Sequence, residues 1–331
     1  MTRENVKPPA LSRSAARAAG RTGPRAGLVA AALLALLSAS GLSPAAGQEG
    51  AAPPYTVRAS VDWAARQLSI EVSLDLAAAG LRMPSGRIEA ERLIDRDLPG
   101  ILAGLVLDLP VDSYRDVADC VDDGSLDESD LLGFGDQAVE HGSSFSRDMR
   151  FFIARYELPL YAVAGIFVRH RTPVSPEAPL EWRATRAYTG IVIYADSGLA
   201  VHGERTTDLA RPCLFPRVYD DAMRLLLERN GVSPEALAAW GEVGYAKADS
   251  VRDGSLLGRI GESPLLIDAT ALFGTDRTDV VIPRDEAMKI LASPGNRALL
   301  AAGKVVIVID GDYLVQGLGP DAGGAAATAR D

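Results

Sequence analysis

The chain has 331 residues, of which 47% are hydrophobic and 24% charged, and its 34 basic and 44 acidic residues give a formal net charge of −10. The range 1–47 holds six of the basic residues and one acidic residue, so the rest of the chain carries 28 and 43, a charge of −15. Such a surface repels phosphate backbones and anionic lipid headgroups, which argues against nucleic acid and direct lipid binding as functions.

The first 47 residues are typical of a Sec-type signal peptide. Four arginines between positions 13 and 25 precede an almost wholly apolar stretch over 26–37, and small residues lead up to Gln48. The apolar stretch is about 12 residues long, short of the roughly 20 that a membrane span needs, so cleavage near Gly47 is favoured over an uncleaved anchor. We therefore expect a periplasmic protein with no transmembrane span in the mature chain. A lipid anchor is not expected, because no cysteine stands near the cleavage point.

The two cysteines, Cys120 and Cys213, leave two alternatives open. In an oxidising compartment they could form a disulfide, which would stabilise the fold by roughly 4–5 kcal/mol in the chain-entropy model. They could instead be two separate thiols, with Cys213 buried inside the sequence RPCLFPR. No CxxC occurs, so the sequence supports neither thioredoxin chemistry nor a zinc clip.

The predicted organisation after the signal peptide is a flexible lead-in over 48–56, one domain over 57–316 and a disordered Gly/Ala-rich tail over 317–331. A period of two over 67–76 predicts a strand with one buried face. A helix opens at residues 84–85, with a kink or break expected near Asp97 because Pro99 follows. The acidic segment 119–130 lacks two ligand positions of a calcium loop, so we interpret it as a solvated loop.

Three further strand-like runs follow, namely residues 148–167, the run that ends at Ala195, and the buried strand 304–310. Within the first of them, Pro159 predicts a bulge or an edge strand. Helices are predicted over 220–229, 233–240 and 283–291, which makes 220–300 a helical insertion before the last strand. Strands and helices that do not alternate regularly favour an α+β fold, with a mixed, largely antiparallel sheet packed by helices.

The search for chemistry finds no catalytic, metal-binding or cofactor-binding motif. The histidines His141, His170 and His202 show no metal-ligand spacing. The glycine-rich stretches match neither the P-loop nor the dinucleotide-binding fingerprint. One alternative stays open: Asp196, Ser197 and His202 follow the strand-like run GIVIYA and could line the pocket of an exported hydrolase or a small-ligand-binding protein. The run itself is better explained as an interior strand, with Gly190 admitting a close backbone neighbour and residues 196–198 forming its exit turn.

The stretches AYTGIVIYADSGLAVH, RPCLFPRVYD and KVVIVID resemble a group of exported bacterial proteins, the LPP20-like lipoproteins and the flagellar assembly proteins FlgP and FlgT in its N-terminal region. The positions that carry the resemblance lie in 188–195, 214–220 and 304–310. They include a candidate structural signature of Tyr188, Thr189, Gly190, Pro216 and Arg217.

This resemblance implies a small fold of helices and strands that serves as a building piece, and it implies no catalytic residues. We therefore expect a non-enzymatic structural or protein-binding component of a flagellar or cell-envelope assembly. Its partners would be other envelope or flagellar proteins, and it could form an oligomer.

Overall fold

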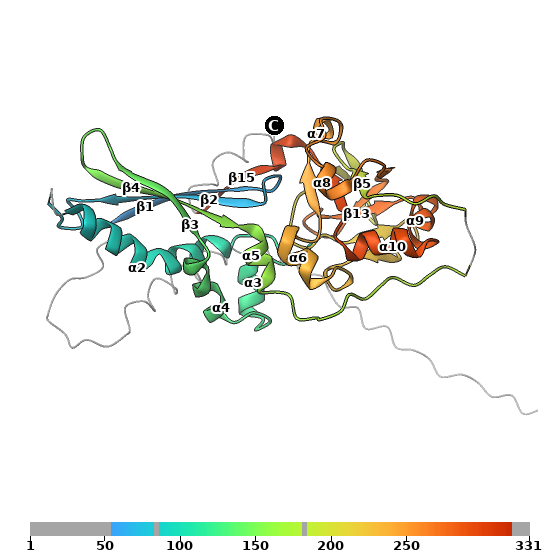
Figure 1. Ribbon diagram of the computed structural model, residues 1–331, viewed down its shortest axis with the longest axis horizontal. Coiled ribbons are helices and arrows are strands. Elements are labelled where there is room, and N and C mark those ends of the chain that lie inside the picture. The colour runs from blue at the N-terminus through green and yellow to red at the C-terminus, as the bar shows by residue number, and fades with distance from the viewer. Residues whose placement is uncertain (1–53, 83–85, 181–183, 320–331) are drawn as a thin grey trace, which may run out of the picture. The chain divides into compact units, whose positions relative to one another are not determined.

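The computed structural model describes residues 54–82, 86–180 and 184–319, in which helices and strands build the predicted α+β fold (Figure 1). The predicted signal peptide over 1–47 and the tail from residue 320 lie outside the described residues. The described strands form three sheets of five, four and six strands.

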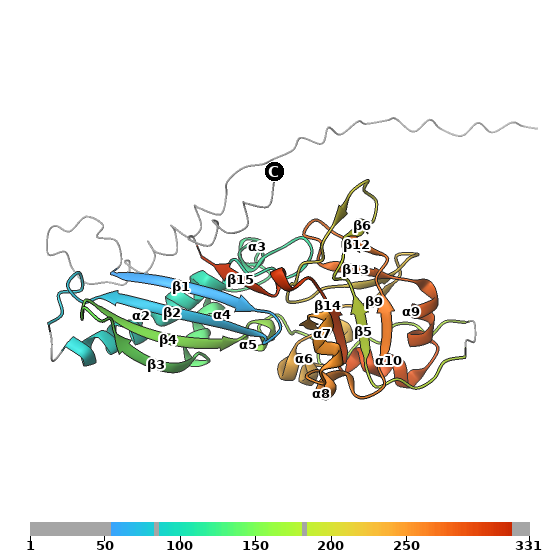
Figure 2. The same cartoon turned by 90° about the horizontal axis from the view of Figure 1, so that it is seen from above.

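The five-stranded sheet is antiparallel throughout and has the order β15-β1-β2-β4-β3 (Figure 2). Its strands are β1 (Tyr55–Asp62), β2 (Gln67–Asp75), β3 (Val139–Phe145), β4 (Phe151–Pro159) and β15 (Val315–Leu318). The period of two predicted for β2 is confirmed, because Leu68, Ile70, Val72 and Leu74 are all buried while the residues between them are more exposed.

The folded chain begins before and ends after the predicted domain boundaries, residues 57 and 316. Tyr55 and Thr56, assigned to the lead-in, belong to β1. Gly317 and Leu318, assigned to the disordered tail, belong to β15, whose residues pair with β1. The tail's composition gave no sign of this strand, because its order comes from hydrogen bonds to a segment about 250 residues earlier in the chain.

One face of the five-stranded sheet packs against α2 (Gly86–Val106). The predicted break near Asp97 is not present, because the helix continues through Pro99. Tyr55 fixes this part of the helix by donating its hydroxyl hydrogen to Asp97 Oδ2, at 2.6 Å, and lies near the carbonyl of Leu93.

The acidic segment predicted as a solvated loop is partly helical. It contains α3 (Val117–Asp122) and α4 (Glu128–Leu132), followed by the 3₁₀ helix η1 (Gly133–Asp136). Asp116 accepts a hydrogen bond from the Asp119 backbone N–H while the Asp119 side chain accepts one from the Asp116 N–H, a reciprocal capping box. The acidic residues therefore begin helices, where carboxylates satisfy unpaired backbone N–H groups.

The structure also differs from the sequence-based prediction at the end of β4. The sequence predicted a long or bent strand across Pro159, but the chain turns there into α5 (Leu160–Gly165), with Pro159 as the residue before the helix. Proline favours this boundary because it lacks the N–H that a continuing strand would donate.

The four-stranded sheet has the order β10-β14-β5-β11 and all its pairs are parallel. Its strands are β5 (Ile191–Tyr194), β10 (Gly244–Ala246), β11 (Leu265–Asp268) and β14 (Val305–Val308). The prediction that the strand around Val306 is buried on both faces is confirmed, since every residue of β14 is buried.

The six-stranded sheet is mixed and has the order β7-β6-β12-β13-β8-β9. Its strands are β6 (Leu199–Val201), β7 (Thr207–Asp208), β8 (Val218–Asp220), β9 (Leu225–Leu227), β12 (Ala271–Phe273) and β13 (Asp279–Ile282). The predicted helix over 220–229 is wrong, because this segment is the β8–β9 hairpin.

The reason for the hairpin is the buried carboxylate of Asp220. It accepts hydrogen bonds from the backbone N–H groups of Ala222 and Arg224 and from the Arg224 guanidinium, with Met223 in a left-handed conformation at φ 58°. These local bonds compete with the helix that the apolar run LLL favours.

The remaining predicted helices are confirmed as α6 (Pro234–Trp240), capped by Ser233, and α9 (Arg284–Leu291). The other elements are α7 (Ala248–Arg252), α8 (Leu257–Ile260), α10 (Pro294–Ala301), η2 (Arg229–Gly231) and η3 (Gly311–Tyr313). The range 220–300 therefore contains strands of two sheets as well as helices.

The close approach predicted at Gly190 is confirmed. A Cβ atom at this position would lie 2.6 Å from the carbonyl oxygen of Ile260. Gly190→Ala should therefore destabilise the protein by roughly 1–3 kcal/mol, because backbone cannot move aside as a flexible side chain can. Urea unfolding measures the effect, with Gly198→Ala as control because no atom lies within 4 Å of its added methyl. Equal stability of the two variants would contradict the prediction.

Candidate functional site

The three residues of the predicted pocket lie on exposed chain around the end of β5 and β6. Asp196, Ser197 and His202 are all exposed, and no hydrogen bond among the described residues joins them. His202 donates its backbone N–H to Leu272 O, and its ring lies edge-on to Phe273. The structure therefore does not assemble a nucleophile and base from them.

The candidate signature residues have structural roles. Thr189 Oγ1 donates to the carbonyl of Ile260, at 2.6 Å, and accepts from the backbone N–H of Ser263. Tyr188 donates its backbone N–H to Asn296 Oδ1. Thr189 and Gly190 thus hold the start of β5 against α8, and Tyr188 joins it to Asn296 in α10.

Pro216 and Arg217 lie just before β8. Pro216 is buried, and the backbone N–H of Arg217 donates to Asp279 Oδ1 at 2.9 Å. Asp279 is completely buried, and burial raises its pKa to about 6. Its Oδ2 atom has no hydrogen-bond partner within 54–82, 86–180 or 184–319.

The two cysteines are free thiols, so the possible disulfide is not formed. Cys120 lies near Ser125, while Cys213 is held between Thr278 and the Tyr245 hydroxyl, which donates to the Cys213 carbonyl at 3.1 Å. Burial raises the pKa of both thiols, so neither is an activated nucleophile at neutral pH.

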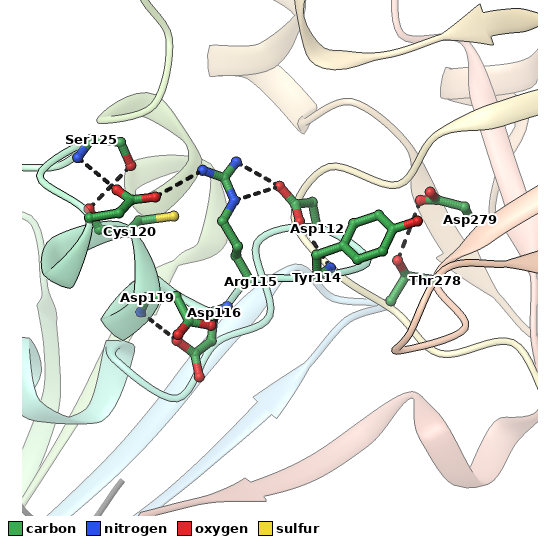
Figure 3. Close-up of polar contacts among 10 residues, drawn as sticks. Asp112, Tyr114, Arg115, Asp116, Asp119, Cys120, Ser125, Thr278 and Asp279 are labelled. Atoms are coloured by element: carbon green, nitrogen blue, oxygen red, sulfur yellow. Dashed lines mark hydrogen bonds and ion pairs between the residues drawn. The ribbon is translucent and has the colours of Figure 1, made fainter. Parts of the chain in front are cut away.

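A group of carboxylates surrounds Arg115 (Figure 3). The Arg115 guanidinium donates to Asp112 Oδ2 at 2.7 Å and contacts Asp123 at 3.4 Å. Asp112 also accepts the backbone N–H of Tyr114. This arrangement orders the turn between α2 and α3, and no set of three or more potential ligand side chains in 54–82, 86–180 or 184–319 is placed to hold a metal ion.

The most unusual buried group is Glu242, which lies two residues after the end of α6. Its side chain is 1% exposed and neither carboxyl oxygen has a hydrogen-bond partner among the described residues. Burial raises the pKa of Glu242 well above its usual range, an effect that the charge of Arg229 opposes. A buried carboxyl with a strongly shifted pKa is characteristic of functional sites.

Glu242 lines a cavity of about 30 Å³, here called the Glu242 cavity. Trp63 also lines this cavity, and in the part of the chain that the structure describes its indole N–H has no hydrogen-bond partner. The other lining residues are Arg66, Leu160, Tyr161, Ala164, Cys213, Leu214, Trp240, Gly241, Val243 and Tyr245. The cavity thus combines two unsatisfied polar groups with largely apolar and aromatic walls.

The Glu242 cavity was not predicted from the sequence. The only local signal is one acidic residue in the otherwise uncharged run AWGEVGYA, which ends in the buried strand β10. Trp63 lies about 180 residues earlier, and nothing in the sequence relates the two.

The shifted pKa of Glu242 predicts a pH dependence of stability. Because its folded-state pKa is raised, its contribution is complete below the unfolded pKa of about 4.3 and is lost as pH rises through the folded value. Glu242→Gln removes this loss, so the variant should become the more stable protein at neutral and alkaline pH. Urea unfolding from pH 4 to 9 measures the difference, with exposed Glu177→Gln as control. Parallel stability curves for wild type and Glu242→Gln would contradict the prediction.

A second candidate feature is the outer face of the five-stranded sheet, on the side opposite α2. A row of charges crosses three strands: Glu71 on β2 pairs with Arg155 on β4 at 3.0 Å and lies 4.0 Å from Arg58 on β1. Beside this row, His141 Nε2 lies 2.5 Å from Glu157 Oε2. These residues and Ser60 and Ser69 line a hollow of about 500 Å³.

Two family models match the chain. Residues 54–165 match the model described as Treponema pallidum Tp0624, N-terminal domain, and residues 190–311 match the one described as Treponema pallidum Tp0624, second domain. The chain is therefore similar to these two domains over the two segments, and β15 lies beyond both matches. No curated protein matches the chain.

These matches give no link to the LPP20-like proteins, FlgP or FlgT, so that resemblance stays a prediction. Within the described ranges, none of the helices has both the length and the apolar character that crossing a membrane requires.

Proposed function

We propose that this protein is an exported, non-enzymatic component that binds other proteins in a bacterial flagellar or cell-envelope assembly. The observation that carries the proposal is the outer face of the five-stranded sheet, where exposed Arg58, Ser69 and Arg155 surround a hollow. Helix α2 packs on the opposite face, so these side chains remain accessible within the described part of the chain.

The chemistry of this face suits a protein partner. Arginine is enriched at protein interfaces, and alternating charges give an interface its register and its selectivity. The Arg58–Glu71–Arg155 row provides such a pattern on three adjacent strands. The signal-peptide-like start of the sequence and the resemblance to exported assembly proteins support the same role.

The alternative, a hydrolase or small-ligand protein that uses Asp196, Ser197 and His202, has no such support. Their exposure and lack of mutual hydrogen bonds leave no oriented base.

The test is site-specific photo-crosslinking in living cells of the source organism. A crosslinker in place of Ser69 should capture envelope or flagellar proteins, while one in place of the exposed Arg205 should not. The double variant Glu71→Arg/Arg155→Glu keeps an ion pair between β2 and β4 but changes the order of charges in the row and replaces the 4.0 Å contact of Arg58 with Glu71 by a like-charge pair. Because these side chains are on an exposed face, it should still fold, and it should lose the captured partner. Identical products from both positions, or no effect of the double variant, would overturn the proposal.

A further inference from the structure

Among the described strands, β3 forms one edge of the five-stranded sheet and pairs only with β4 (Figure 2). All its residues are exposed or half-buried. Natural proteins commonly protect an edge strand with lysine, proline or a bulge, because its unpaired backbone groups attract further strands. β3 contains neither lysine nor proline, and its register shifts between Glu140 and Gly142. The stretch GSSF after this bulge is therefore a regular and unprotected edge.

The backbone groups that point away from the sheet follow from the register. Just past β3, Ser146 donates its N–H to Phe151 O at 2.9 Å, so residue 146 faces β4. Inward and outward residues alternate along an antiparallel ladder, which directs the N–H and C=O groups of Ser143 and Phe145 outward. Within 54–82, 86–180 and 184–319 these outward groups have no hydrogen-bond partner.

The outward groups are complementary to those of a second copy of the same strand. When two β3 strands lie antiparallel around a two-fold axis at Ser144, Ser143 of each copy exchanges two backbone hydrogen bonds with Phe145 of the other. Every outward N–H and C=O group of both residues is then paired. Ser144 faces its own counterpart as a non-hydrogen-bonded pair, the arrangement in which opposite side chains are closest.

The charges at the two ends of β3 fit the same antiparallel order. The segment 116–146 contains nine acidic residues and no lysine or arginine, and Glu140 lies near the start of β3. Arg147 is exposed just beyond its end. Antiparallel pairing brings Glu140 of each copy beside Arg147 of the other, an attraction between opposite charges. Asp148 lies at the same end, but its carboxylate is already bonded to the Ser146 hydroxyl.

We propose that two copies of this protein pair through β3 and join their five-stranded sheets into one continuous sheet. The half-buried ring of Phe145, which packs edge-on against Phe152, becomes a diagonal neighbour of Phe145 in the second copy. A contact of one strand pair is small, so the dimer is reversible and its population rises with protein concentration. The edge is distinct from the Arg58–Glu71–Arg155 row, so this inference is independent of the protein-binding function proposed above.

The first experiment is disulfide formation at the two-fold axis. Non-hydrogen-bonded pairs have Cα atoms about 4.5 Å apart, which a disulfide can bridge. On mild oxidation, Ser144→Cys should therefore form a linked dimer roughly tenfold or more faster than exposed Ser197→Cys, because pairing raises the effective thiol concentration. The native Cys120 and Cys213 are buried and do not compete. Equal rates, or a faster reaction of Ser143→Cys, would overturn the proposed pairing.

The second experiment measures the dimer without a crosslink, by sedimentation equilibrium of residues 48–331. Ser143→Pro removes an outward N–H and no bond to β4, so the variant should fold, as circular dichroism will check. Two hydrogen bonds of the dimer are lost, so its dissociation constant should rise about tenfold or more, whereas Ser143→Ala keeps the N–H and should stay within about threefold of wild type.

A wild-type chain that stays monomeric at every concentration would overturn the proposal, and so would a folded Ser143→Pro variant that dimerises as wild type does. Should Ser143→Pro fail to fold, the reaction of Ser144→Cys gives the decision. Loss of the partner captured at Ser69 would leave this result unchanged, because the two experiments concern different surfaces.

Discussion

Val306→Asp should abolish cooperative folding. Val306 is completely buried in β14, between β10 and β5, and packs in a core cluster with Val192, Ala246 and Ile260. An aspartate there would place an unpaired charge, or an unsatisfied neutral carboxyl, in an apolar environment at a cost of several kcal/mol. Because globular proteins are stable by only about 5–15 kcal/mol, one such change removes much of the total.

The measurement is thermal unfolding followed by circular dichroism, with Val315→Asp as the matched control. Val315 is also a strand valine, but it is 58% exposed, so its substitution should change stability by about 0.5 kcal/mol or less. A melting temperature for Val306→Asp close to that of the control would show that β14 does not lie in the centre of the sheet.

The strands predicted correctly from the sequence are those whose order of apolar and polar residues is set by hydrophobic burial alone. In β2 alternate residues face α2, and in β14 both faces are covered, so hydrophobic burial alone specifies each strand. Gly190 was interpretable for a similar reason, since a glycine beside a buried strand commonly marks a close backbone neighbour.

The errors occurred where hydrogen bonds of particular side chains decide the local structure. Asp220 turns an apolar, helix-like run into a hairpin, and Asp116 and Asp119 begin a helix in a segment whose charge predicted a loop. The same acidic residue type favours a cap, a turn or a solvated loop according to its backbone neighbours, and composition does not distinguish these cases.

The candidate site is harder to predict than the fold, because its members come from distant parts of the chain. The residues proposed from the sequence, Asp196, Ser197 and His202, are close in sequence but do not form a site. Glu242 and Trp63 are far apart in sequence and line one cavity. A buried carboxyl becomes recognisable only when its burial and its missing partners are known.

Arg259→Met should destabilise the protein by about 3 kcal/mol or more. The Arg259 guanidinium is 7% exposed and donates to the carbonyls of Gly303 at 2.8 Å, Trp240 at 2.8 Å and Gly241 at 3.1 Å. The carbonyls of Gly303 and Gly241 would be left without a partner, at about 1–3 kcal/mol each, while the Trp240 carbonyl keeps the Arg66 guanidinium at 3.0 Å. Methionine restores the apolar volume of the side chain but none of these bonds.

One opposing effect must be weighed for Arg259. Burial lowers its pKa to about 9, which shows that the charged guanidinium is poorly solvated, so its removal recovers part of that desolvation energy. The loss of the hydrogen bonds should still exceed this gain, because two of the three carbonyls lie at the end of α6, where a cation is also favoured by the helix dipole. Urea unfolding at pH 7 compares Arg259→Met with Arg205→Met, an exposed position that should change little. Equal midpoints for the two variants would mean that the carbonyls find other partners and that Arg259 does not join the end of α6 to Gly303, two residues before β14.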